Sequence, residues 1–227
     1  MNLLNIEQGS HDWFAARTGA ATGSRIREAL STLSRASQGY KAGDRSAESR
    51  KYMLQLALER ITGEVVRHHV TPEMDWGTEH EPHAVRAYEA VTEAACRKVG
   101  IAVHPSIPLF MASPDRYIGS DGVLEVKCPT SMVHLEYLRG GVVPELYIPQ
   151  CLSELACDPS REWLDFVSFD PRFTGKAIKL QIFIAPRRYR SEWAMKIAEM
   201  EDGVRKFLAE TETLTAELQE LAEKRVL

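Results

Sequence analysis

The sequence has few cysteines, no long apolar run and no internal repeat, and each shortage excludes a class of protein. Its four cysteines form no CxxC pair, and no histidine follows them at zinc-finger spacing. We therefore expect reduced, mostly buried thiols, as in a cytoplasmic protein. No run of 18 or more apolar residues is present, so we expect no membrane-spanning helix, and the N-terminus lacks the basic and apolar parts of a secretory signal.

Net charge is also small, at −4 for 227 residues, but the charges are unevenly distributed. Residues 17–51 contain eight Lys or Arg against three acids, whereas residues 192–227 contain nine acids against five bases. A basic front and an acidic tail are compatible with nucleic-acid binding by the front. They are equally compatible with two solvated helix faces.

The pattern of apolar residues predicts one domain with an α/β fold, in which a central mixed sheet is flanked by helices. A polar, glycine-containing loop is expected over 34–47. The sequence favours helices over 10–18, 23–32, 48–62, 75–97, 131–139, 145–157 and 191–224. It favours strands over 100–104, 107–111, 116–119, 122–128, 162–169 and 177–185.

The clearest chemical signal is a predicted hairpin within "SPDRYIGSDGVLEVKCP", residues 113–129. Side chains alternate along a strand, so Glu125 and Lys127 share one face of the returning strand. Antiparallel pairing across the turn would bring Asp115 to the same place. Asp121 lies within the Gly-Ser-Asp-Gly turn, and turn chemistry accounts for it without a ligand role.

Two carboxylates at one buried place repel each other, and a divalent cation removes that conflict. Mg²⁺ takes oxygen ligands and usually one or two carboxylates, and the backbone carbonyl of Val126 offers a further oxygen. A lysine beside the ion would orient water or stabilise charge on phosphorus. Asp115, Glu125 and Lys127 thus fit metal-assisted phosphodiester hydrolysis. The alternative is a surface hairpin with a weak, exposed Glu–Lys pair.

Two further polar residues have open interpretations. On a helix, Glu81 shares a face with Val85 and Tyr88, which points it inward towards a metal or a metal-bound water. The alternative is that it caps its own helix N-terminus. Gln150 lies in the first turn of a helix and points either inward or, as its residue type alone favours, into solvent.

At these residues the sequence resembles the lambda exonuclease and YqaJ-type viral recombinase nucleases, which belong to the PD-(D/E)xK superfamily. The similar stretches occur in the family's order from Glu7 to about Phe173. They are "EQGSHDWFAARTGAATGS", "WGTEHE", "SPD" followed by "LEVKCP", "LRGGVVPE", "YIPQ" and "DPRF". Cys151-Leu152 follows Gln150 where the family often has a second Gln.

The resemblance implies a restriction-endonuclease-like core and a role for each matching residue. Asp115 and Glu125 would bind the metal, with Val126 and Glu81 near it, and Lys127 and Gln150 would complete the catalytic set. A hydroxyl-rich turn beside an arginine suits a phosphate. The residues implied for the 5′-phosphate of the cut strand are Arg17, Ser24, Thr22 and Ser113. From charge alone, Arg25, Arg35, Lys41 and Arg45 are candidates for contact with the DNA backbone.

The resemblance also implies the activity. It is a Mg²⁺-dependent exonuclease, with Mn²⁺ as a substitute and one or two ions bound. Such an enzyme degrades one strand of double-stranded DNA from 5′-phosphorylated ends in the 5′ to 3′ direction. Expected partners are DNA ends, a single-strand annealing protein of phage-type recombination and two further copies in a trimeric ring. The alternatives are an endonuclease of the same superfamily and an inactive DNA-binding protein.

Within the single nuclease domain, 1–227, we expect three parts. Residues 1–62 would hold the helices that contact phosphate and DNA. Residues 75–185 would form the catalytic core, and residues 191–227 the C-terminal helix.

Overall fold

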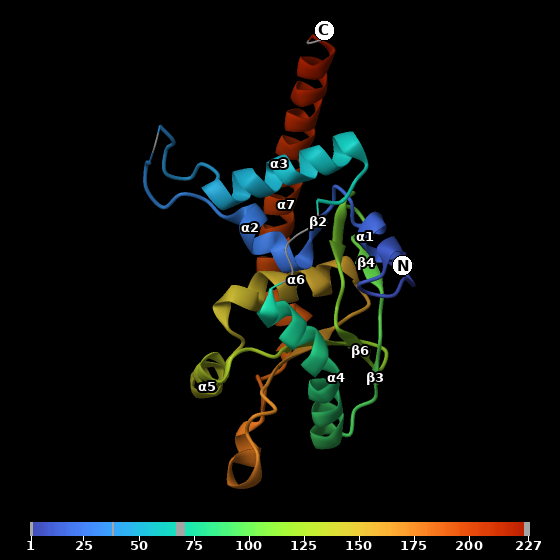
Figure 1. Ribbon diagram of the computed structural model, residues 1–227, viewed down its shortest axis with the longest axis vertical. Helices are drawn as coiled ribbons and strands as arrows, with labels where there is room; N and C mark the ends of the chain where they lie inside the picture. Colours follow the sequence, from blue (N-terminus) through green and yellow to red (C-terminus); the bar gives the residue numbers. More distant parts are fainter. Residues whose placement is uncertain (1, 38, 67–70, 225–227) are drawn as a thin grey trace.

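The computed structural model of the protein describes residues 2–37, 39–66 and 71–224 (Figure 1). Two β-sheets form its centre, and helices surround them. The long helix α7 runs past the other helices, and its C-terminal end projects beyond them. Among the described residues, no helix combines the length and the apolar character that crossing a membrane requires.

The larger sheet has the strand order β10–β8–β7–β6–β3. Strand β9 also pairs with β8, outside this order. Strand β7 is antiparallel to β6 and parallel to β8, so the sheet is mixed, as predicted. The parallel pair requires a crossover, which helices α5 and α6 provide. The strands are β3 (Cys96–Arg97), β6 (Arg116–Ile118), β7 (Gly122–Lys127), β8 (Trp163–Phe169), β9 (Ile182–Ile184) and β10 (Arg188–Tyr189).

The smaller sheet has the order β1–β4–β5–β2. Its strands are β1 (Asn2–Leu4), β2 (Ala21–Thr22), β4 (Ile101–Val103) and β5 (Phe110–Ala112). Strand β5 leads through Ser113 and Pro114 to Asp115 and then into β6 of the larger sheet. The parallel pair β2–β5 places Thr22 beside Met111, so the N-terminal segment lies against the approach to Asp115.

Local capping signals explain several helix limits. Ser46 accepts a hydrogen bond from the Ser49 N–H at the start of α3, and Gly63 ends this helix in the left-handed conformation with φ 70°. Thr71 accepts from the Met74 N–H at the start of α4. The helices are α1 (His11–Ala16), α2 (Ile26–Leu30), α3 (Ala47–Thr62), α4 (Pro72–Thr92), α5 (Ser131–Gly140), α6 (Ile148–Cys157) and α7 (Arg190–Glu223). Short 3₁₀ helices are η1 (Gly23–Arg25), η2 (Glu145–Tyr147) and η3 (Gly175–Leu180).

Three sequence-based expectations about these elements are wrong. The strand predicted over 177–185 begins only at β9, because η3 precedes it. Helix α4 begins at Pro72 rather than at 75, and Pro82 lies in its interior. The helix predicted to extend to 97 ends at Thr92, and Cys96–Arg97 form strand β3. The sequence did not predict β1, β2, β3 or β10, because strands this short show no periodic pattern. Residues 225–227 of the expected C-terminal helix lie outside the described residues.

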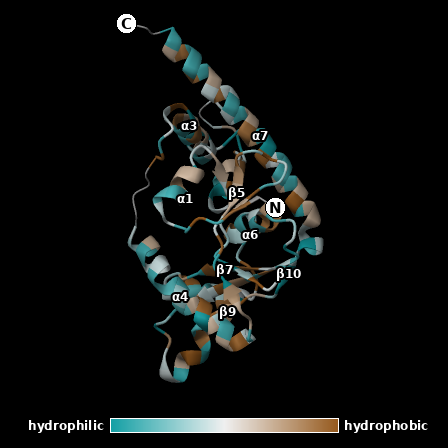
Figure 2. Ribbon diagram, turned by 90° about the vertical axis from the view of Figure 1, so that its right-hand side faces the viewer, coloured by the Kyte–Doolittle hydropathy of each residue, from teal (hydrophilic) through white to brown (hydrophobic). Residues whose placement is uncertain are grey.

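The two faces of β7 contact different helices. Leu124 and Val126 pack with Ala84, Val85 and Tyr88 of α4 in one apolar cluster. Val123, on the opposite face, belongs to the cluster that contains residues of α3, α6 and α7. Figure 2 shows hydrophobic segments among the central strands and alternating hydrophobic and hydrophilic residues along α7. Glu125 and Lys127 therefore share the face of β7 that α6 covers.

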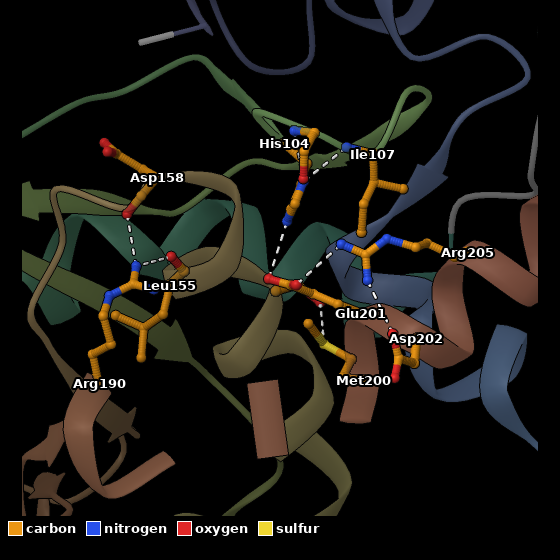
Figure 3. A network of polar contacts seen from close by, with 11 residues as sticks. His104, Ile107, Leu155, Asp158, Arg190, Met200, Glu201, Asp202 and Arg205 are labelled. Atoms are coloured by element: carbon orange, nitrogen blue, oxygen red, sulfur yellow. Dashed lines mark hydrogen bonds and ion pairs between the residues drawn. The ribbon is translucent and has the colours of Figure 1, made fainter. Parts of the chain in front are cut away.

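A polar network fastens α7 to the turn between β4 and β5 (Figure 3). His104 Nδ1 accepts from the backbone N–H groups of Ser106 and Ile107, at 3.2 and 3.0 Å. Its Nε2 must then carry the proton, and it donates to Glu201 Oε1 over 3.1 Å. Burial lowers the pKa of His104, which suits this neutral form. The network fixes the turn that leads into β5 and on to Asp115.

Candidate active site

The predicted hairpin brings Asp115 and Glu125 together. Strands β6 and β7 pair Arg116 with Leu124, and one further step in this register places Asp115 opposite Glu125. Asp115 Oδ2 accepts a hydrogen bond of 2.7 Å from the Val126 N–H. Burial, followed by the Glu125 charge, raises the pKa of Asp115 well above its usual range, although Lys127 opposes this shift. The convergence expected from the sequence is therefore present.

Glu125 is fully buried, so the alternative of a weak, exposed Glu–Lys pair is wrong. Lys127 forms an ion pair with Glu125 Oε1. Its ammonium lies 5.1 Å from the ring centroid of Tyr147. Burial alone would lower the pKa of Lys127, but Glu125 and then Asp115 raise it above its ordinary value. The lysine is thus held as a cation between two carboxylates and an aromatic ring.

Gln150 points inward, contrary to the interpretation that its residue type favoured. Its Nε2 donates to Glu125 Oε1 over 2.7 Å and to Glu154 Oε1 over 3.3 Å. Both contacts arise because α6 covers the Glu125 face of β7. The first turn of this helix is therefore part of the site.

Glu81 also lies near the site but contacts a different group. Its Oε1 pairs with Arg116 Nη1 at 2.7 Å, and Arg116 also donates to the Asp115 carbonyl. Arg116 pairs with Leu124 across the hairpin, so it lies on the α4 face of the sheet, away from Glu125. Glu81 nevertheless remains close enough to contribute to the raised pKa of Asp115.

The residues predicted to bind phosphate gather beside Asp115. Arg17 ends α1, and its guanidinium lies 3.7 Å from the ring centroid of Trp13. Trp13 Nε1 donates to Ser113 Oγ over 3.2 Å, which ties α1 to the segment before Asp115. Burial lowers the pKa of Arg17 to about 10, so the side chain stays charged at neutral pH. In the described part of the chain it forms no ion pair within 4.0 Å, and its charge suits an anion.

Thr22 and Ser24 flank Gly23, which lies close to α6 and β5. A Cβ on Gly23 would lie 3.1 Å from Ser153 Cβ and 3.4 Å from Ala112 Cβ. Thr22 is buried, and its N–H donates to the Tyr52 hydroxyl over 3.1 Å, whereas Ser24 is exposed. These contacts pack the predicted hydroxyl-rich turn against strand β5 and helix α6.

The four candidate DNA contacts differ in their surroundings. Arg25 pairs with Glu28 at 2.6 Å, donates to Gln55 and lies over the Tyr52 ring. Arg45 pairs with Glu210 of α7 at 2.8 Å, so part of its charge is already matched. Arg35 and Lys41 are exposed on the loop that projects from the body (Figure 1).

Sequence reasoning missed two residues of this region. Glu154 is buried one helical turn after Gln150, and an acid within the apolar stretch "QCLSELAC" was the available signal. Trp13 lies four residues before Arg17, the spacing that places two side chains on one face of a helix. Glu154 lies near Glu125, and Trp13 contacts Ser113. Each pair is more than 20 residues apart in the sequence, so no local pattern predicts these contacts.

The donor set fits a divalent cation. Glu125 Oε2 is buried and has no hydrogen-bond partner in the described chain, so a cation would satisfy it. Two carboxylates and the Val126 carbonyl match the oxygen ligands of Mg²⁺, which completes its shell with water and phosphate. Within the described ranges, no group of three or more His, Cys, Asp or Glu side chains is placed to hold a metal ion. Such a site would therefore depend on substrate oxygens as well.

Comparison with known proteins identifies the family. The sequence profile of the YqaJ-like viral recombinase domain matches residues 12–161. The chain belongs to this family. The resemblance inferred from the sequence is thus confirmed, and YqaJ-type membership supports a nuclease that acts on DNA. A search of curated protein sequences finds no match.

Solved structures agree with the YqaJ-type assignment. The alkaline exonuclease LHK-Exo from Laribacter hongkongensis is 34% identical, with a TM-score of 0.82 over 96% of this chain and 100% of that one. Its complex with dAMP matches equally well. A phage-related exonuclease from Haemophilus somnus 129PT is 16% identical, with a TM-score of 0.57 over 88% of this chain and 96% of that one, and it shows the fold alone. The predicted α/β nuclease fold and the prediction of an enzyme are confirmed.

Proposed function

We propose that the protein is a Mg²⁺-dependent exonuclease that degrades one strand of linear double-stranded DNA from 5′-phosphorylated ends in the 5′ to 3′ direction. The product would carry 3′ single-stranded overhangs for phage-type recombination. The observation that carries the proposal is the meeting of Asp115, Glu125 and Lys127 next to the Arg17–Ser113 region. The 34% identical LHK-Exo, which binds dAMP, supports a site for nucleotide ends.

Each residue would have one role in the reaction. Asp115, Glu125 and the Val126 carbonyl would hold one or two Mg²⁺ ions, with Mn²⁺ as a substitute. The bound ion would supply a hydroxide nucleophile and neutralise charge on the scissile phosphate. Lys127 would orient the attacking water, and Gln150 would hold the Glu125 carboxylate. Glu81 would act from a distance, by fixing Arg116.

End recognition would fall to the N-terminal segment of the nuclease domain. Arg17 would pair with the terminal 5′-phosphate, and Ser113, Ser24 and Thr22 would surround it. Arg25, Arg35, Lys41 and Arg45 would follow the DNA backbone, which carries no base information and makes binding weaken with salt. On this assignment residues 1–62 contact DNA, residues 75–185 perform catalysis and residues 191–227 form the C-terminal helix.

A digestion of two DNA substrates tests the activity. With Mg²⁺, linear 5′-phosphorylated duplex should release nucleotides and retain its 3′ strands, while covalently closed circular duplex should stay intact. Cleavage of the circle would favour the alternative of an endonuclease. Binding without cleavage of either substrate would favour an inactive DNA-binding protein.

The proposed setting is the cytoplasm of a bacterial host, where a single-strand annealing protein would receive the overhangs. A ring of three copies around the duplex would keep the enzyme on its substrate. Native mass measurement tests the ring directly, because a trimer gives three times the 25.5 kDa chain mass. A monomer under digestion conditions would contradict the ring.

A further inference from the structure

Glu154 is a buried acid directly behind the candidate metal ligands. It lies on α6 one helical turn after Gln150, and residues four apart share a helix face. Its side chain is 1% exposed, and every residue of α6 from Cys151 to Cys157 is buried. Burial, and then the Glu125 charge, raises its pKa well above the usual range. Burying an acid here without a cation costs free energy of folding, so we expect Glu154 to have a role other than stabilising the fold.

Three other buried acids have a cation beside them, whereas buried Glu59 accepts hydrogen bonds from the Gly19 N–H and the Gln55 amide. Asp158 pairs with Arg161, Asp165 with Arg187 and Asp170 with Arg172. For Glu154, the described part of the chain provides no cation within 4.0 Å, and its Oε2 is buried without a hydrogen-bond donor. Among the N–H donors of the described chain, only the Gln150 amide reaches its Oε1, and the Glu125 carboxyl group also lies within hydrogen-bond reach. Within the described ranges, Glu154 therefore accepts a hydrogen bond from Gln150 and forms no ion pair.

The Gln150 amide lies between two acceptors. Its nitrogen has two hydrogens, and the partners are Glu125 Oε1 at 2.7 Å and Glu154 Oε1 at 3.3 Å. Both partners accept, so only the nitrogen end of the amide can face them. Without Glu154, a single acceptor would hold the amide, which would then be freer to rotate away from Glu125.

We propose that Glu154 is a positioning residue that fixes the Gln150 amide and, through it, the orientation of the Glu125 carboxylate towards a divalent cation. This inference rests on the proposed function of the site. Groups that orient a metal ligand typically change metal affinity or activity by about 10- to 100-fold when removed. Glu154 contacts Glu125 directly as well as through Gln150. On this proposal the route through Gln150 dominates, so Glu154 and Gln150 should act as one unit.

A double-mutant cycle tests this unit. The variants are Glu154→Met, Glu154→Gln, Gln150→Ala and Glu154→Met combined with Gln150→Ala, with Glu217→Met at an exposed position of α7 as control. Calorimetric titration with Mn²⁺ alone gives metal affinity, and digestion of linear 5′-phosphorylated duplex gives kcat. We expect Glu154→Met to weaken Mn²⁺ binding and lower kcat by about 10- to 100-fold. Glu154→Gln keeps an acceptor for Gln150, so it should retain most of the wild-type Mn²⁺ affinity and kcat.

The combined variant decides the mechanism. If Glu154 acts through Gln150, the double variant should lose no more Mn²⁺ affinity or kcat than the more impaired of the two single variants. Independent sites would instead give losses that add. Additive losses, or Glu154→Gln as impaired as Glu154→Met, would overturn the proposal, because the charge itself would then matter. Failure of the wild-type chain to cut linear duplex would refute the proposed function instead, while the Mn²⁺ titrations would still test the coupling.

Thermal unfolding separates positioning from a structural role. Methionine replaces a buried acid that has no cation by an apolar side chain of similar length, so Glu154→Met should keep or raise Tm in EDTA. A large fall in Tm together with the loss of Mn²⁺ binding would assign Glu154 to the packing of α6 and overturn the proposal.

Discussion

Asp115 Oδ2 accepts a hydrogen bond from the backbone N–H of Val126 at 2.7 Å. In a strand, the N–H and C=O of one residue point to the same edge. The Val126 carbonyl therefore faces the same edge of β7 as its N–H, next to the start of β6 at Arg116. At this edge the Val126 carbonyl would offer a divalent cation a third oxygen ligand beside the two acids.

Removing the charge of Asp115 should abolish cleavage. Asp115→Asn keeps an oxygen that accepts from Val126 but removes the charge that a cation needs. We expect loss of nucleotide release with Mg²⁺ and retention of duplex binding in Ca²⁺, measured by fluorescence anisotropy. Asp121→Asn, a change in the nearby turn, is the matched control and should stay active. Equal loss in both variants would remove Asp115 from the site.

Lys127 should contribute to kcat more than to DNA binding. Its ammonium lies between Glu125 and the Tyr147 ring, where it can stabilise charge that develops during cleavage. Loss of one such group typically lowers kcat by about 10²- to 10³-fold, and we expect this of Lys127→Met in single-turnover digestion. Lys98→Met, at an exposed position, should behave like wild type. Equal rates for wild type and Lys127→Met would contradict the assigned role.

Arg17 should determine the preference for phosphorylated ends. Its charge is partly buried on the Trp13 ring beside Ser113, without an ion pair in the described chain. Arg17→Ala should lower the rate on 5′-phosphate ends towards that on 5′-hydroxyl ends, while Arg27→Ala, which is exposed on α2, should not. Because the 5′-hydroxyl substrate is the internal reference, an unchanged ratio of the two rates would reject the pocket.

The pH dependence of stability without metal should show the raised pKa of Asp115. The folded state binds this proton more tightly than the unfolded state, so ionisation destabilises the fold as pH rises from 3.8 through the raised pKa. Asp115→Asn cannot ionise at this position. In EDTA its Tm should exceed that of wild type at about pH 9, and the gain should vanish as pH falls towards the unfolded-state pKa. A gain that is the same at every pH would contradict the shift.

Salt should separate the candidate DNA contacts. Each phosphate contact contributes about −0.9 to the slope of log affinity against log salt concentration. Arg35 and Lys41 are exposed, so the Arg35→Ala, Lys41→Ala double variant should reduce the magnitude of the slope by about 1 to 2. A matched Arg97→Ala, Lys98→Ala variant measures the effect of charge alone, since both residues are exposed outside the segment assigned to DNA contact. Identical slopes for both double variants would show that the loop makes no specific contact.

Local pattern was sufficient to predict the centre of the site. Glu125 and Lys127 alternate with apolar residues, and a glycine-rich turn precedes them, so strand period and turn chemistry together fix the register with Asp115. Helix limits at Ser46 and Gly63 also follow from residue type, because both positions need special capping groups.

Long-range packing determines the parts that were not predicted. Gln150 faces inward because α6 crosses the sheet, and nothing in "YIPQ" alone encodes that crossing. Likewise, Glu81 pairs with Arg116, which the sequence did not predict, because β6 presents Arg116 on the α4 face. The 3₁₀ helix η3 interrupts an apolar stretch that resembles a strand by composition.

The close contact of Gly23 with Ser153 and Ala112 has a consequence for the length of the product. Ser153 lies on the same helix as Gln150, and Ala112 precedes Ser113 by one residue, so one packed contact joins the end-binding segment to the metal site. On the proposed function, this contact would set the distance between the terminal phosphate and the bond that is cut. A larger side chain at position 23 would increase this distance, and the size of the released fragments would then change.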